Sequence, residues 1–424
     1  MRIAILFLWA MAAAAGEASW ITRYAAESRA ANQACGAKDF AACRQHLTTL
    51  LELLDGRADI VYRMAKVEAQ LGNREAALRG LILFSKMKLP FADPSADSEF
   101  ADLRSDSAFP EIAARLAAAR QPASSSRPFL TLPEKDLVTE DIAYDPAGER
   151  FFISSVRHGK ILSIGKDGTA KEFLAEGKSE IWAVQALGVD AKRRYLWAST
   201  SAMPESLHFK AEDSGRSALL RFSLTDGALL KRYDLPRDGE HVLGDLTIGP
   251  EGDVFVSDSK GPVYWVPHDQ DRLQVLIPAG TFRSPQTPAL SADGRTLFVP
   301  DYSRGISAVD LRTRQSHLVA HPPELSLAGI DGLYLTGNTM LAVQNGTSPE
   351  RILRLRLDAA LSRIEAFDVV EANAPDFGDP THGVVVGNRF YFIVHSGWEH
   401  MADNGQVKAG AIFEAPGIRE FDIR

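Results

Sequence analysis

The stretch Gly244–Asp258, with the sequence GDLTIGPEGDVFVSD, decides the fold. It predicts a strand, a tight turn containing Gly and Pro, and a second strand that ends in Ser-Asp. A segment of the same plan, QTPALSADGRTLFVPD, begins 42 residues later at Gln286. Repetition at this spacing indicates that the chain builds one supersecondary unit more than once.

Six segments of the chain follow this plan, and their starts are 45, 59, 42, 45 and 51 residues apart. They are EDIAYDPAGERFFIS from Glu140, QALGVDAKRRYLWAS from Gln185, GDLTIGPEGDVFVSD from Gly244, QTPALSADGRTLFVPD from Gln286, DGLYLTGNTMLAVQN from Asp331 and HGVVVGNRFYFIVH from His382. Each is followed by a further strand-like stretch, and units of about 45 residues with four short strands are typical of β-propeller blades.

We therefore predict a mainly β protein with a six-bladed β-propeller over residues 129–424. The ring should close by pairing of its first strand, Phe129–Leu132, with the last blade. An all-β sandwich is the alternative fold, but a sandwich would not require six matching units.

The region 19–120 carries apolar residues at three- and four-residue spacing, which predicts an α-helical domain. DFAACRQHL from Asp39 and NREAALRGL from Asn73 repeat at a spacing of 34 residues, the period of tetratricopeptide-type helical hairpins. The region 22–100 resembles that family, and such an array could dock a protein partner or only form a packed cap. The aperiodic segment 121–128, QPASSSRP, predicts a linker.

The N-terminus predicts export. Arg2 precedes an apolar run from Ile3 to Ala15, and small residues follow, which is typical of a signal peptide spanning residues 1–18 with cleavage near Ala18. An N-terminal core helix is the alternative. We expect a periplasmic or secreted protein without a membrane span, because the run is short for a bilayer and the sequence contains no second long apolar segment.

Composition limits the partners. The net charge of −8 disfavours nucleic acid, because phosphate binding requires a basic surface. The two cysteines, Cys35 and Cys43, could form a disulfide in an exported protein or could be two small packing residues; both readings remain open.

The innermost strand of each propeller blade lines a central channel, so the first residues of the six segments should converge. They are Glu140, Gln185, Gly244 with Asp245, Gln286, Asp331 and His382. Carboxylate and amide oxygens are the ligands that Ca²⁺ prefers, so a divalent cation, most plausibly Ca²⁺, is expected. Alternatively, these groups only hydrogen-bond one another and water.

The region 129–424 resembles the SMP-30/gluconolactonase/LRE-like family of six-bladed, calcium-dependent propellers, on the segments beginning at Glu140, Gly244, Gln286 and Asp331. The resemblance implies a divalent metal held by a Glu, two Asn and an Asp, over which a lactone or related ester is hydrolysed. Glu140 matches the Glu and Asp331 matches the Asp, but Gly244 and Gln286 stand at the two Asn positions. A Gln carbonyl can still ligate a metal, and Asp245 could compensate for the glycine.

The leading functional hypothesis is a metal-dependent hydrolase of a lactone or small ester, with Glu140, Gln286 and Asp331 as metal ligands. Asp331, Asp245 or His382 would take the proton of the attacking water. A non-catalytic binding propeller and a lyase using His382 are the alternatives.

Three further residues are candidates for contact with the small-molecule substrate. They are Gln185, His208 in the long insertion 203–217, and Trp398, which precedes the extended loop 401–408. Both loops could close over the channel mouth, or the first could be a solvated spacer and the second a polar loop with a buried Trp.

Overall fold

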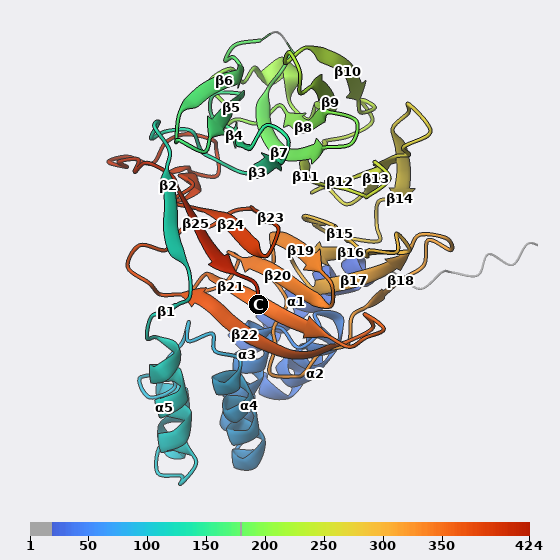
Figure 1. Cartoon of the computed structure of the whole chain (residues 1–424). Coiled ribbons are helices and arrows are strands. Elements are labelled where there is room, and N and C mark those ends of the chain that lie inside the picture. The colour runs from blue at the N-terminus through green and yellow to red at the C-terminus, as the bar shows by residue number, and fades with distance from the viewer. Residues whose placement is uncertain (1–18, 179) are drawn as a thin grey trace, which may run out of the picture.

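The computed structural model describes residues 19–178 and 180–424, and it is a six-bladed β-propeller with helices at its N-terminal end (Figure 1). This confirms the predicted fold. The predicted signal peptide lies outside the described residues. Within the described part of the chain, no helix has the length and apolarity needed to cross a membrane.

The first three blades each consist of four antiparallel strands. Blade one contains β3 (Ile142–Asp145), β4 (Arg150–Ser155), β5 (Lys160–Gly165) and β6 (Ala170–Leu174). Blade two contains β7 (Ala183–Asp190), β8 (Tyr195–Ser201), β9 (Ser217–Ser223) and β10 (Leu229–Asp234). Blade three contains β11 (Leu243–Ile248), β12 (Val254–Asp258), β13 (Val263–Val266) and β14 (Gln274–Ile277).

The last three blades include two strands from before the propeller proper. Blade four contains β15 (Ala289–Leu290), β16 (Thr296–Asp301), β17 (Gly305–Asp310) and β18 (Ser316–Leu318). Blade five contains β19 (Gly332–Thr336), β20 (Thr339–Gln344), β21 (Arg351–Leu357) and β22 (Ile364–Ala372), with β1 (Ala123–Ser124) on its outer edge. Blade six contains β23 (Gly383–Val386), β24 (Arg389–Val394) and β25 (Gly417–Asp422), with β2 (Arg127–Thr131) outermost.

The pairing of β2 with β25 closes the ring, as expected for the first strand. The segment 121–128 is therefore not simply a linker, because it supplies all of β1 and the beginning of β2. The hydrophobic core lies between adjacent blades; Phe152 of blade one and Phe222 of blade two, for example, belong to the same buried cluster.

Two of the repeated segments end in an Asp, and the structure shows why. In each case this Asp ends the second strand of a blade. Asp258, at the end of β12, accepts hydrogen bonds from the backbone N–H groups of Val242 and Lys260. Asp301, at the end of β16, accepts equivalent bonds from Arg283 and Ser303. Each buried Asp thus joins the loop that follows its own strand to the loop that enters its blade.

The N-terminal region forms two helical hairpins and a final helix. Its helices are α1 (Trp20–Gly36), α2 (Phe40–Leu53), α3 (Ala58–Gln70), α4 (Arg74–Lys86), the short η1 (Ser98–Leu103) and α5 (Phe109–Ala119). The 34-residue repeat corresponds to α2 and α4, where Leu47 and Leu81 are both fully buried. The tetratricopeptide resemblance itself stays a prediction. Cys35 and Cys43 form a disulfide, which decides between the two readings left open.

The helices pack against the sheets of blades four and five, as the blue ribbons of Figure 1 show. The indole N–H of Trp20 donates to the carbonyl of Thr281 at 2.9 Å. Arg351 of β21 is fully buried, and its Nη1 donates to the carbonyl of Met87 at 2.9 Å. His321, beyond β18, places Nε2 3.0 Å from a carboxylate oxygen of Asp55. These contacts fix the helical region against one side of the propeller.

The His321–Asp55 pair should make this docking pH-dependent. Burial lowers the pKa of His321, but the hydrogen bond and charge of Asp55 outweigh burial, so the pKa is raised. A His whose pKa rises on folding stabilises the protein fully below its unfolded pKa, and this contribution disappears as the pH rises through the folded pKa. We expect the wild type to lose more unfolding free energy than His321→Gln between about pH 6 and pH 8, measured by urea unfolding.

The exposed His317 of β18 provides the matched control for this experiment. His317→Gln should retain the pH dependence of the wild type. Equal pH dependence in wild type and His321→Gln would contradict the assignment.

Candidate functional site

A cavity of about 300 Å³, here called the mouth pocket, opens at one end of the channel. It is lined by Glu140, Ser284, Gln286, Tyr302, Asp331, Asn345, Asp379, Thr381 and Trp398. These residues come from blades one, four, five and six, and each lies just before an inner strand or just after a second strand. In antiparallel hairpins these two positions fall at the same edge, which is why distant residues meet here.

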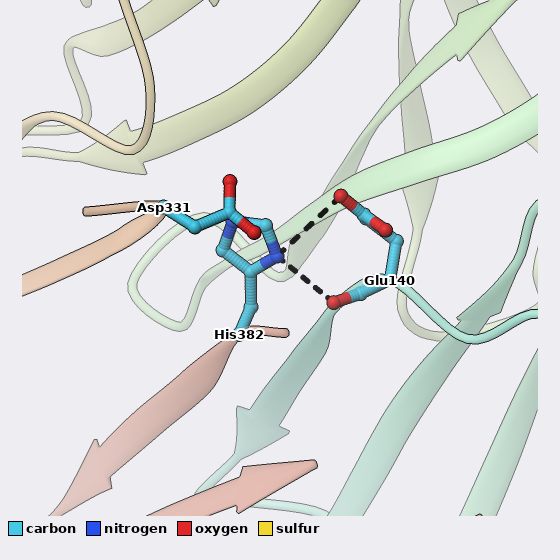
Figure 2. A group of neighbouring side chains, drawn as sticks. All are labelled: Glu140, Asp331 and His382. Carbon is cyan, nitrogen blue, oxygen red and sulfur yellow. Dashed lines mark hydrogen bonds and ion pairs between the residues drawn. The ribbon is translucent and has the colours of Figure 1, made fainter. Parts of the chain in front are cut away.

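Glu140 and Asp331 form the acidic centre of the mouth pocket. One potential metal-ligating atom from each of Glu140, Asp331 and His382 lies within 4.8 Å of the other two, and Figure 2 shows the three side chains together. Asn345 Nδ2 donates to Asp331 Oδ2 at 2.7 Å, and the indole N–H of Trp398 donates to Glu140 Oε2. Each carboxylate is therefore fixed by one neutral donor and keeps further lone pairs for another partner.

His382 is only 2% exposed at its side chain and lies outside the lining of the mouth pocket. Its Nδ1 is 2.9 Å from the backbone carbonyl of Glu140 and 3.9 Å from Glu140 Oε1, the two contacts dashed in Figure 2. Its Nε2 is 2.6 Å from Asp245 Oδ1, an ion-pair distance without the alignment of a good hydrogen bond. Both ring nitrogens thus face oxygens.

The surrounding charges shift the pKa values of this cluster. Burial lowers the pKa of His382, but the negative charges of Asp245 and Asp331 outweigh burial and raise it well above its ordinary value. Burial raises the pKa values of Glu140 and Asp331, and His382 only partly offsets this. Burial also raises the pKa of Asp141, whose Oδ2 accepts from the N–H of Leu187.

The residues of the mouth pocket fit a divalent cation. Four acidic residues, Glu140, Asp141, Asp245 and Asp331, are grouped around one imidazole, so the cluster carries excess negative potential. A separation of up to 4.8 Å between donor atoms suits a cation bound at 2.3–2.6 Å from each. The carboxylates of Glu140 and Asp331 fit this role, whereas a protonated His382 with both nitrogens engaged does not.

The other predicted site residues divide into two groups. Gln286 and Trp398 line the mouth pocket, and Gln286 Nε2 donates to Ser284 Oγ at 2.9 Å. Asp245 is buried and contacts His382 and the hydroxyl of Thr287, so it lies outside the pocket lining and does not replace the missing ligand at Gly244.

Gln185 and His208 are not among the residues that line the mouth pocket, and their contact with a substrate stays a prediction. Gln185 is buried within β7, and its Oε1 has no hydrogen-bond partner among the described residues. A register shift in β7 between Val184 and Leu187 displaces this strand from the simple alignment. His208 is partly exposed and pairs with Glu176 at 2.9 Å.

Sequence reasoning missed Tyr302 and Asn345, which line the mouth pocket and are joined by a 3.1 Å hydrogen bond. Both directly follow the second strand of a blade, whereas the prediction took its channel residues from the starts of inner strands and took only loop residues, His208 and Trp398, from after second strands. The sequence signal that could have identified them is their position directly after β16 and β20. Because the strands of a blade are antiparallel, these positions lie at the same end of the channel as the residues that precede the inner strands.

The two loops considered as lids contact each other. Gly405 of the second loop lies directly against Pro204 of the first loop. A Cβ atom added to Gly405 would lie only 2.3 Å from the backbone carbonyl carbon of Pro204. Met203, Trp398 and Val407 pack into one apolar cluster with buried Met401. The loops therefore form a joint wall that holds Trp398 against Glu140.

The His382–Asp245 contact should be necessary for stability. Removing the charge of Asp245 leaves a buried imidazolium without its nearest partner, and breaking such a pair costs about 3–5 kcal/mol. We expect Asp245→Asn to lower the unfolding free energy by about 3 kcal/mol in denaturant titrations.

Asp238→Asn is the matched control, because Asp238 also contacts a histidine but its side chain is 72% exposed. It should change the unfolding free energy by less than about 0.5 kcal/mol. Similar values for the two variants would show that the buried pair contributes nothing special.

Comparison with known proteins leaves the family open. No protein-family model and no curated protein matches this sequence. Among solved structures, a gluconolactonase from Xanthomonas campestris is similar, with 16% identity, a TM-score of 0.47, and 71% of this chain and 98% of that chain covered. A luciferin-regenerating enzyme is 11% identical with a TM-score of 0.49, and the match covers 71% of this chain and 95% of that chain. Virginiamycin B lyase from Staphylococcus aureus is 16% identical with a TM-score of 0.44, and the match covers 62% of this chain and 80% of that chain. Likenesses this weak support no conclusion about activity.

Proposed function

We propose that this chain hydrolyses a small ester or lactone in the mouth pocket. The observation that carries the proposal is the convergence of two fixed acidic side chains, Glu140 and Asp331, on an open cavity of about 300 Å³. Buried carboxyl groups with raised pKa values that face a cavity are typical of sites that transfer protons.

Glu140, Asp331 and the side-chain carbonyl of Gln286 would hold a divalent cation, with Ca²⁺ best suited to such oxygen ligands. When bound, such a cation supplies Lewis-acid chemistry, by polarising a carbonyl group and lowering the pKa of water. The chain's own residues position the reacting groups around it. Asn345 holds Asp331, Trp398 holds Glu140, and Tyr302 holds Asn345.

Asp331 is the general base in this proposal because its carboxylate is fixed by Asn345 at the pocket surface. It takes a proton from water as the water oxygen bonds to the carbonyl carbon of the substrate. The bond between that carbon and the ester oxygen then breaks, and the leaving oxygen receives the proton. The products are an acid and an alcohol, or one hydroxy acid from a lactone.

A lyase that uses His382 as its base fits the geometry less well. His382 lies outside the pocket lining, and its two nitrogens face Glu140 and Asp245. Its position instead suits a supporting role, in which its positive charge partly balances the surrounding carboxylates.

The first experiment measures bound divalent metal and hydrolysis of a panel of lactones and nitrophenyl esters. We expect about one metal per chain in the wild type and its loss in Glu140→Ala/Asp331→Ala. Asp331→Asn should lower kcat by about 100-fold or more, because it removes the base while conserving side-chain size.

Asp293→Asn, an exposed substitution outside the mouth pocket, should leave metal content and kcat unchanged. A stable metal-free wild type without turnover of any substrate would overturn the hydrolase and favour a binding propeller.

A further inference from the structure

A second cavity, of about 490 Å³, lies between the helical region and the propeller, and we call it the interdomain cleft. One wall comes from the beginning of α3 and the segment after α4, including Arg57, Leu89 and Phe91. The other wall comes from blades four and five, including Arg283 and Tyr302. Its volume falls within the range of small-molecule sites, roughly 300–1,000 Å³.

The interdomain cleft adjoins the mouth pocket. Tyr302 lines both cavities, and Arg283 of the cleft is the chain neighbour of Ser284 of the pocket. The hydroxyl of Tyr302 contacts Asn345, which in turn holds Asp331. A molecule that reacts at Asp331 and is too large for the mouth pocket would therefore extend past Tyr302 toward the helices.

Arg283 gives the interdomain cleft a positive charge that the protein leaves available. Its Nη1 donates to Ser303 Oγ at 2.8 Å, and its guanidinium lies 5.2 Å from the ring centre of Tyr24. The guanidinium forms no ion pair with another described residue, although Asp301 accepts a hydrogen bond from the backbone N–H of Arg283. Arg57 differs, because Asp59 accepts from both its Nε and Nη2, at 2.6 and 2.7 Å.

The opposite wall of the interdomain cleft is mixed, because Arg57 and Asp59 pair with each other there, whereas Leu89 and Phe91 are apolar. Phe91 is 40% exposed, although it packs edge-on against Phe84 at 5.0 Å between ring centres. The exposed part of an aromatic ring that is fixed from behind offers contact area to a ligand at little entropic cost. Besides the Arg57–Asp59 pair, the cleft thus combines an apolar surface with the guanidinium of Arg283, which forms no ion pair among the described residues.

We propose that the interdomain cleft binds the anionic part of an extended ester substrate, whose reacting carbonyl lies in the mouth pocket. Arg283 binds a carboxylate of the substrate, and Phe91 contacts the apolar chain between that carboxylate and the ester. The proposal rests on the hydrolase function and adds the substrate class. It also gives the helical region a direct role, since this region supplies one wall of the substrate site.

The test compares 4-nitrophenyl hydrogen glutarate with 4-nitrophenyl valerate, which match in acyl length but differ in terminal charge. We expect kcat/KM of the wild type to favour the anionic ester at least tenfold, since a hydrogen bond to a charged group is worth about a tenfold change or more. In Arg283→Gln this ratio should fall toward one, mainly through KM. Added salt should reduce the wild-type ratio, because it screens the charges.

Arg272→Gln is the matched control, because Arg272 is an exposed arginine outside both cavities. It should keep the wild-type ratio. A wild type without preference, or an Arg283→Gln variant that retains it, would overturn the cleft proposal while leaving the hydrolase proposal standing.

Binding of the corresponding 4-nitroanilides, measured by calorimetry, separates the two proposals if neither ester is hydrolysed. Tighter binding of the glutaryl than of the valeryl anilide, lost in Arg283→Gln, would support the interdomain cleft without the hydrolase. Equal or absent binding of the two anilides would overturn the cleft as well.

Discussion

The closure of the ring by β2 and β25 is the constraint on which the rest of the molecule depends. It makes the last blade a neighbour of the first, so that His382 of blade six lies 2.9 Å from the carbonyl of Glu140 in blade one. These residues are 242 positions apart in the chain. The strand β2, which precedes blade one in the chain, completes blade six and covers the edge of β25.

The closed ring brings several acidic side chains into a small volume. The carboxylates differ in the partners that stabilise them. Asp245 contacts His382, and Asp141 accepts from backbone N–H groups of Ile142 and Leu187. Glu140 and Asp331 receive only single neutral donors and remain at the mouth pocket. Asp141 and Asp245 thus take part in these contacts, and Asp141 also lines a separate cavity of about 680 Å³, whereas Glu140 and Asp331 line the mouth pocket.

The sequence was sufficient for the propeller because each unit repeats a strand–turn–strand pattern, and blades three and four also share the buried aspartates Asp258 and Asp301. It also predicted that Glu140 and Asp331, which precede inner strands, lie close together, whereas their roles stay predictions. It did not predict that Gln185 lies within β7 at a shift in strand register and outside the mouth pocket. Tyr302 and Asn345 required knowledge of which strand ends meet. The interdomain cleft depends on how two separately patterned regions dock, and no local pattern encodes that.

The short strand β1 has a consequence for attempts to study the propeller alone. It pairs with the end of β22, a nine-residue strand that would otherwise be the outer edge of blade five. Truncation before the first blade would remove β1 and β2 together. It would also remove the helical region that contacts Arg351 and lines the cleft beside Tyr302. A fragment beginning at β3 would present unpaired backbone groups on two blades and invite strand-to-strand association. The propeller is therefore best expressed and studied together with the helices.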